Sequence, residues 1–248
     1  MENGVIGYFD FINIPNYKNL KGVTDPRKYL ENIKADGYAT SHKYMDNLMR
    51  VIETWHLTDY DKKEETKMSN SPLVVYTKLS PNHSGQRKHI IDTITIHCIV
   101  GQWTAKQGCD YFANTDRQCS ANYVVGKDGS IGLSVEEKNR SWCSGGTDKY
   151  GNPIRVNGIS GADNDHRAIT IEVASDTTHP YAVTDQAYNA LVRLVADICK
   201  RNGIKKLLWK GDKSLVGKVS EQNMTVHRWF AQKACPGDYL YNLSLIHI

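Results

Sequence analysis

The sequence predicts an α/β fold with a mixed central β-sheet flanked by helices, preceded by a small all-α N-terminal segment. Apolar and polar residues alternate over residues 91–97 and 168–173, as they do in half-buried strands. An amphipathic helix follows Thr184, and residues 1–60 show only the spacing of helices. With 248 residues, 40% of them hydrophobic, the chain has enough apolar material for a packed core.

Residues 1–60 are expected to form three short helices. The first carries Val5, Ile6, Phe9 and Ile12 on one face. Asp25-Pro26 is a typical helix start, because Asp can cap the free N–H groups and proline suits the first turn. Ser41 is the expected cap of the third helix, whose apolar face is Tyr44, Leu48, Val51, Ile52 and Trp55.

Residues 61–72 are polar and end in proline, which indicates a linker. The α/β domain is then expected over residues 73–242. Residues 122–125 and 130–133 predict two strands joined by a hairpin turn at Lys127-Asp128-Gly129. The helix after Thr184 should bury Ala187, Leu191, Leu194, Val195 and Ile198 and end at Gly203.

Charge, hydropathy and cysteine content limit the possible functions of the protein. A formal net charge of +4 would favour an anionic polymer but is too weak to indicate nucleic acid. The sequence contains no apolar run of about 18 residues, so no membrane-spanning helix is predicted. No signal peptide is visible at the N-terminus. The 6 cysteines include no Cys-x-x-Cys pair, so most are expected to be buried thiols, with Cys235 as the exception.

Three residues have the chemistry of a zinc site. His97 ends a predicted strand and shares a face with Thr95, opposite Ile96. His227 and Cys235 are separated by a short segment that turns at Pro236-Gly237. Imidazole and thiolate suit Zn²⁺, and three protein ligands leave a tetrahedral position open for water. Each residue alone also fits a plain role, His97 as a surface polar group and Cys235 as a buried thiol.

Residues 73–242 resemble the zinc-dependent N-acetylmuramoyl-L-alanine amidases of the phage-lysozyme and peptidoglycan-recognition fold, known as amidase type 2. Six short pieces in the family's order carry the resemblance. They are Thr95-Ile96-His97, Ala121-Asn122-Tyr123, Lys127-Asp128-Gly129-Ser130-Ile131, Ile169-Thr170-Ile171-Glu172, Thr225-Val226-His227 and Lys233-Ala234-Cys235-Pro236-Gly237.

The resemblance implies a function and a set of roles. It implies hydrolysis of the amide bond between N-acetylmuramic acid and L-alanine in bacterial peptidoglycan, by an endolysin or autolysin that acts at the cell wall. Its cofactor would be Zn²⁺, bound by His97, His227 and Cys235. Lys233 would stabilise the oxyanion and Tyr123 would line the site. Glu172 matches a glutamate that some members use as a base or anchor, although a strand glutamate is as often a structural acceptor.

Two other classes of protein remain open. A non-catalytic peptidoglycan-binding module could keep the fold without the metal, but it should have lost some of the residues named above. A different zinc hydrolase or a structural zinc protein is the second alternative. A structural site would need a fourth protein ligand, and Cys98 is a poor candidate because it should point away from its neighbour His97.

Both ends of the chain have unusual features. Residues 4–60 resemble the C-terminal part of a flagellar-muramidase-type glucosaminidase domain, through residues 17–22, 34–40 and 48–60. That family's catalytic glutamate lies upstream of this region, so no glucosaminidase activity is expected. The final residues, Leu243-Ser244-Leu245-Ile246-His247-Ile248, match the translation of a common transposon sequencing adapter and are expected to be a non-native tail.

Overall fold

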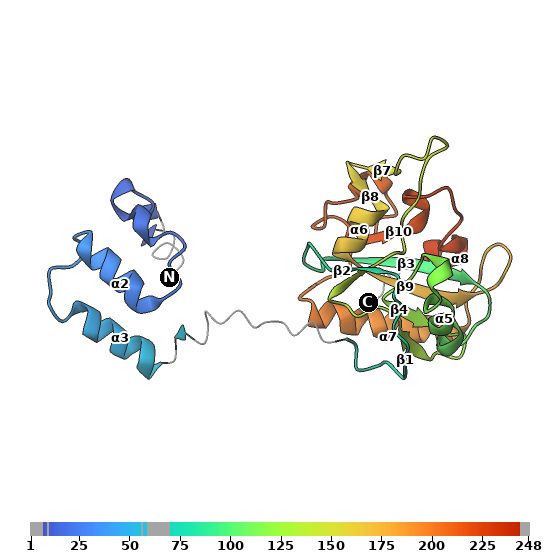
Figure 1. Cartoon of the computed structure of the whole chain (residues 1–248), viewed down its shortest axis with the longest axis horizontal. Helices are drawn as coiled ribbons and strands as arrows, with labels where there is room; N and C mark the ends of the chain where they lie inside the picture. The colour runs from blue at the N-terminus through green and yellow to red at the C-terminus, as the bar shows by residue number, and fades with distance from the viewer. Residues whose placement is uncertain (1–6, 9, 56, 59–69, 244–248) are drawn as a thin grey trace. The chain divides into compact units, whose positions relative to one another are not determined.

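The structure is a computed structural model that describes residues 7–8, 10–55, 57–58 and 70–243 (Figure 1). The chain divides into two compact units, residues 1–65 and 66–248. The expected helix positions Val5, Ile6 and Phe9, linker residues 61–69 and tail residues 244–248 lie outside the described residues.

The first unit contains η1 (Pro15–Leu20), α2 (Pro26–Ala35) and α3 (Tyr44–Thr54) around the buried Tyr17, Leu20, Leu30 and Ile33. Asp25 caps α2 as predicted, accepting the N–H of Lys28. The third helix differs from its prediction. It begins after Lys43 with no side-chain cap, so Ser41 is not the N-cap, and Trp55 is 70% exposed rather than part of an apolar face.

The second unit is built on a mixed six-stranded sheet in the order β1-β5-β4-β9-β3-β10. Its strands are β1 (Tyr76–Thr77), β3 (Thr93–Val100), β4 (Tyr123–Val125), β5 (Ile131–Leu133), β9 (Ala168–Ser175) and β10 (Met224–Val226). Only β4 and β5 pair antiparallel, as the predicted hairpin requires, while β4, β9, β3 and β10 run parallel. The mixed sheet predicted from the sequence is thus confirmed.

Helix α7 (Asp185–Arg201) covers one face of the sheet and lies beneath it in Figure 1. Thr184 caps it as predicted by accepting the N–H of Ala187. The predicted apolar face, Ala187, Leu191, Leu194, Val195 and Ile198, is fully buried against Ile94, Ile96, Ile169 and Ile171. Burial of each large side chain contributes roughly 1.5–3 kcal/mol, so this contact supplies much of the second unit's stability.

The other face of the sheet carries α5 (Ala105–Phe112) and α6 (Gly161–Arg167). Two ribbons border it: β2 (His83–Gln86) with β6 (Asn139–Ser141), and β7 (Arg155–Val156) with β8 (Ile159–Ser160). Short helical segments complete the unit: η2 (Thr115–Arg117), η3 (Lys213–Leu215), η4 (His227–Trp229) and α8 (Gly237–Leu243). Leu240 of α8 packs into the core beside α7.

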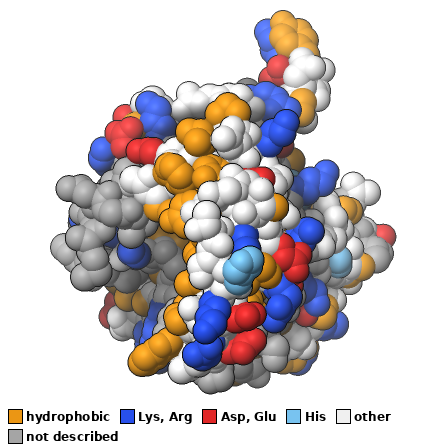
Figure 2. All heavy atoms as spheres, turned by 90° about the vertical axis from the view of Figure 1, so that its left-hand side faces the viewer, with side chains coloured by type: hydrophobic (Ala, Val, Ile, Leu, Met, Phe, Trp, Pro, Cys, Tyr) orange, Lys and Arg blue, Asp and Glu red, His pale blue; other side chains and the backbone are white. Residues whose placement is uncertain are grey.

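Two residues of the predicted linker belong to the second unit by their contacts. Asn70 Oδ1 accepts the N–H of Glu137, and Ser71 N donates to the Tyr123 hydroxyl at 2.8 Å. Among the described residues, no helix is long and apolar enough to cross a membrane. Figure 2 shows acidic, basic and hydrophobic side chains interspersed on the face it displays, in keeping with the mild net charge.

Candidate metal centre

Two histidines occupy matching positions on adjacent parallel strands: His227 directly follows β10, whereas His97 lies within β3, which continues to Val100 rather than ending at His97 as predicted. β10 pairs with β3 so that Thr225 lies opposite Thr95 and Val226 opposite Ile96. A histidine follows each of these apolar residues: His227 follows Val226 and begins η4, and His97 follows Ile96 within β3. Their ring centroids are 4.9 Å apart, and both residues are buried. The repeated Thr-apolar-His pattern thus brings two imidazoles together on the face opposite α7.

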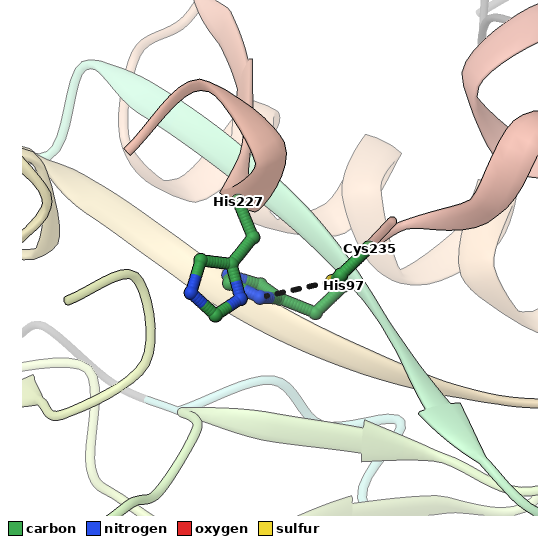
Figure 3. Close-up of side chains that lie close together, drawn as sticks. All are labelled: His97, His227 and Cys235. Carbon is green, nitrogen blue, oxygen red and sulfur yellow. Dashed lines mark hydrogen bonds between the residues drawn. The ribbon is translucent and has the colours of Figure 1, made fainter. Parts of the chain in front are cut away.

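Cys235 completes the group from the segment between η4 and α8. Its Sγ lies 3.5 Å from His97 Nδ1, and Figure 3 shows the three side chains converging. Strand β10 pairs with β3 only as far as Val226. Beyond that point the backbone N–H of Cys98 in β3 donates to Cys235 Sγ, at 3.4 Å, rather than to a strand carbonyl. Cys98 packs in the core on the α7 side, as its place next to His97 predicts, but it also borders the cavity beside Cys235.

The donor set fits a zinc ion. The ligand atoms of His97, His227 and Cys235 all lie within 4.8 Å of one another. Tetrahedral Zn²⁺, with bonds of about 2.1 Å to nitrogen and about 2.3 Å to sulfur, would separate a nitrogen and a sulfur ligand by about 3.6 Å. The 3.5 Å between Cys235 Sγ and His97 Nδ1 matches that edge.

Burial keeps both histidines in the form that binds metal. It lowers the pKa of His97 well below its usual value, with the nearby His227 adding to the effect. Burial also lowers the pKa of His227 to about 4, and the charge of Lys233 adds to this. Both imidazoles are therefore neutral at neutral pH, as metal coordination requires. The cysteine thiol is held protonated by burial, which raises the pKa of Cys235, so metal binding must displace its proton.

Glu172 lies beside His97 on the neighbouring strand β9, where the two residues are register partners. Its Oε1 is 3.9 Å from His97 Nδ1 and accepts from Cys143 Sγ at 3.8 Å. Because His97 is neutral, this approach is not an ion pair. Burial raises the pKa of Glu172 to about 7, although the charge of Lys233 opposes that rise. A carboxyl group with this pKa can both accept and release a proton near neutral pH.

A cavity of about 350 Å³ opens over these residues. Lys233, Glu172, His227 and Cys235 line it together with Phe112, Ser120, Trp142, Cys143 and Tyr181. Lys233 is exposed, two residues before Cys235, so its ammonium group adds a positive charge to the lining. The structure therefore brings together five of the six residues singled out from the sequence.

The sixth, Tyr123, requires a correction because it does not line the cavity. It pairs with Ile171 of β9, which places its ring on the α7 face, opposite Glu172. There it is fully buried, and its hydroxyl bonds Glu137 Oε1 and the Ser71 N–H. Arg201 also pairs with Glu137 at 2.6 Å. Tyr123 thus belongs to a buried polar network that joins α7 to the start of the second unit.

Some residues that border the site were not predicted from the sequence. One is Cys143, which forms a second group of potential ligand atoms within 4.8 Å together with His97 and Glu172. Ser144 and Gly145 lie against the outer ring nitrogens of the two histidines. They belong to a loop that is distant from both histidines in the sequence and is brought next to them only by folding.

Comparison with known proteins identifies the family. Residues 86–238, more than half of the chain, match the family model of N-acetylmuramoyl-L-alanine amidases. The chain belongs to this amidase family. The match includes His97, His227 and Cys235, and with them Glu172 and Lys233. A search of curated protein sequences found no match.

Several solved structures are similar to this amidase chain. A selenomethionine derivative of AmpD is 20% identical, with a TM-score of 0.46, covering 71% of this chain and 96% of its own. A mutant endolysin from Bacillus subtilis is also 20% identical, with a TM-score of 0.43 and coverages of 65% and 88%. Drosophila peptidoglycan recognition protein SA is 16% identical, with a TM-score of 0.43 and coverages of 68% and 89%. The family assignment rests on the sequence match.

Proposed function

We propose that this amidase is zinc-dependent and cleaves the bond between N-acetylmuramic acid and L-alanine in peptidoglycan, acting at the bacterial cell wall as an endolysin or autolysin. One observation carries the proposal. His97, His227 and Cys235 converge at a cavity that Lys233 and Glu172 also line. Three protein ligands with an open fourth position are typical of catalytic rather than structural zinc sites.

His97, His227 and Cys235 would hold the ion through His97 Nδ1, a His227 ring nitrogen and Cys235 Sγ. When bound, zinc supplies a Lewis acid that polarises a carbonyl group and lowers the pKa of water. The walls of the cavity hold the reacting carbonyl between the metal ligands and Lys233, with Trp142 and Tyr181 as apolar surfaces for the substrate. This confinement reduces the entropy that the reaction would otherwise lose.

Glu172 is the proposed proton carrier. Its carboxylate accepts a proton from the attacking water and delivers it to the alanine nitrogen, which leaves as the amine. The pKa near 7 suits both steps. Its Oε2 is buried and has no hydrogen-bond partner in the part of the chain that the structure describes, so this oxygen is available for the proton.

Lys233 is the proposed oxyanion partner. Attack on the amide carbon moves negative charge onto the carbonyl oxygen, and a fixed positive group near that oxygen lowers the barrier. Lys233 lines the same cavity as His227 and Glu172. The ammonium group therefore stabilises the tetrahedral intermediate more than the neutral amide.

Purified peptidoglycan provides the direct test. The zinc-loaded protein should release N-terminal alanine, a chelator should stop the release, and added zinc should restore it. His227→Ala should abolish the activity, whereas the matched control His179→Ala, at a histidine whose side chain is 72% exposed, should not. Binding to peptidoglycan without any alanine release would instead favour a non-catalytic recognition module of the same fold.

We also propose that residues 1–60 have no glucosaminidase activity, since the segment resembles only the C-terminal part of such a domain. The same digestion should therefore yield no new reducing ends. Reducing ends released by a His227→Ala protein, which lacks amidase activity, would contradict this proposal.

A further inference from the structure

One loop contacts the outer nitrogens of both histidines. His97 Nε2 lies 3.3 Å from Ser144 Oγ, and His227 Nε2 lies 3.4 Å from the carbonyl oxygen of the next residue, Gly145. Because a carbonyl can only accept, His227 must carry its proton on Nε2, which leaves Nδ1 free for a metal. His97 directs Nδ1 toward Cys235, so its Nε2–H donates to Ser144. The loop thus selects the same tautomer in both rings.

Asp165 of helix α6 holds this loop. Its Oδ2 accepts the backbone N–H groups of Cys143 and Ser144, both at 2.9 Å, and its side chain is fully buried. The start of α6 presses on the same loop. A Cβ at Gly161 would lie 1.9 Å from the carbonyl oxygen of Ser144, so only glycine permits this approach. The loop position is therefore set from two points of one short helix.

Asn164, the residue before Asp165, connects β3 and β10, the two strands that position the histidines. Its Nδ2 donates to Thr95 Oγ1 at 2.9 Å, and its Oδ1 accepts from Thr225 Oγ1 at 3.0 Å. The two threonine hydroxyls also bond each other at 2.7 Å. Each threonine lies two residues before a histidine, and Asn164 is buried. This triangle fixes the spacing of the strands directly below the metal centre.

We propose that Asn164 and Asp165 are positioning residues for a divalent metal ion, zinc in the proposed function on which this inference rests. Asn164 sets the distance between the strands that bear the histidines. Asp165 sets the orientation and tautomer of the imidazole rings through Ser144 and Gly145. Partners of this kind raise metal affinity by roughly 10–100-fold, because an imidazole that is already oriented loses less freedom on binding.

Zinc affinity of the full-length protein, measured by competition with a chromophoric chelator, tests the proposal. Asp165→Ala should lower the affinity by roughly 10–100-fold and change the visible absorption of the Co²⁺-substituted protein. Asp165→Asn should restore affinity to within roughly threefold of the unmodified protein, since its amide oxygen can accept the same two N–H groups. Asp163→Ala is the matched control, because Asp163 lies on the same helix but, among the described residues, its side chain bonds Ser160 and Arg155 and not the loop.

Ser144→Ala guards against loss of folding in Asp165→Ala. It removes the hydroxyl that contacts His97 and also interacts with the Asp165 carboxylate, and should lower zinc affinity with an altered Co²⁺ spectrum. Unchanged affinity and spectrum in both folded variants would overturn the positioning role of Asp165, and unchanged affinity in a folded Asn164→Ala would overturn that of Asn164, while the proposed function would stay intact. An equal loss in Asp163→Ala would likewise overturn these roles, because it would show a general effect of helix stability. Absence of zinc binding by the unmodified protein would overturn both proposals.

Discussion

His97 and Glu172 are register partners on the parallel strands β3 and β9, with His97 Nδ1 and Glu172 Oε1 3.9 Å apart. This places the nitrogen of a proposed metal ligand and a carboxyl group on the same face of the sheet, beside the cavity that Glu172 lines. In the proposed function the two neighbouring strands have different roles: β3 supplies a metal ligand and β9 supplies the group that transfers protons.

Glu172→Gln should lower kcat for alanine release by roughly 10²–10⁴-fold, because the amide cannot carry the proton from water to the leaving nitrogen. Zinc affinity should change little, since Glu172 is not one of the proposed ligands. Steady-state kinetics on a soluble muramoyl-peptide, together with the zinc content of the purified variant, would measure both.

The control is Glu136→Gln, which alters an acidic residue that pairs with Lys138 outside the cavity. Near-normal kcat in Glu172→Gln would exclude proton transfer by this residue. Loss of zinc in that variant would instead indicate that Glu172 serves as a ligand or anchor.

Lys233→Ala should lower kcat by roughly 10²–10³-fold, as observed when an oxyanion donor is removed from other hydrolases. The metal should remain bound, because Lys233 contributes charge to the cavity without offering a ligand in this arrangement. Gln232→Ala, at the exposed neighbouring residue, is the matched control. If KM rose while kcat stayed unchanged, Lys233 would bind the substrate rather than the transition state.

Cys235→Ser should lower zinc affinity by more than the roughly 10–100-fold that loss of an outer hydrogen-bond partner costs. A hydroxyl is a far poorer zinc ligand than a thiolate. Chelator competition measures the affinity, and Cys199→Ser, at a buried cysteine of α7 that does not line the cavity beside Cys235, is the control. Equal zinc binding by both variants would remove Cys235 from the ligand set.

The parts of the fold that were predicted correctly have local signals. Helix α7 shows its period, its cap at Thr184 and its stop near Gly203. Apolar and polar residues alternate in the sequences of β3 and β9, although the structure buries both faces of these strands rather than one. The pairing of His97 with His227 could also be expected, because both follow a threonine and an apolar residue. Such patterns depend on neighbours in the sequence, so they can be read without the fold.

The face of the sheet on which the Tyr123 side chain lies could not be predicted from the neighbouring sequence. Strand β4 has three buried residues and no alternation, so only its pairing with β9 fixes the direction of each side chain. A shift of one residue in that register would reverse every side chain of the strand. The contacts of Asp165 with the loop at Ser144 are invisible for the same reason, since they join segments that meet only in the folded chain.

Tyr123→Phe should therefore reduce stability and leave catalysis unchanged. The substitution keeps the ring but removes the hydroxyl that bonds Glu137 and the N–H of Ser71, which leaves buried polar groups without a partner. We expect the free energy of unfolding to fall by about 1–3 kcal/mol. Denaturant unfolding of the metal-free protein would measure it, with Tyr150→Phe, at a side chain that is 76% exposed, as the control.

The kinetic half of this prediction distinguishes the two possible roles of the tyrosine. The network of Tyr123, Glu137 and Arg201 lies on the α7 face, whereas the cavity opens on the other face of the sheet. At a temperature where the variant stays folded, kcat for alanine release should match that of the unmodified protein. A large fall in kcat with no loss of stability would show that the hydroxyl reaches the reaction, which this register of β4 and β9 does not permit.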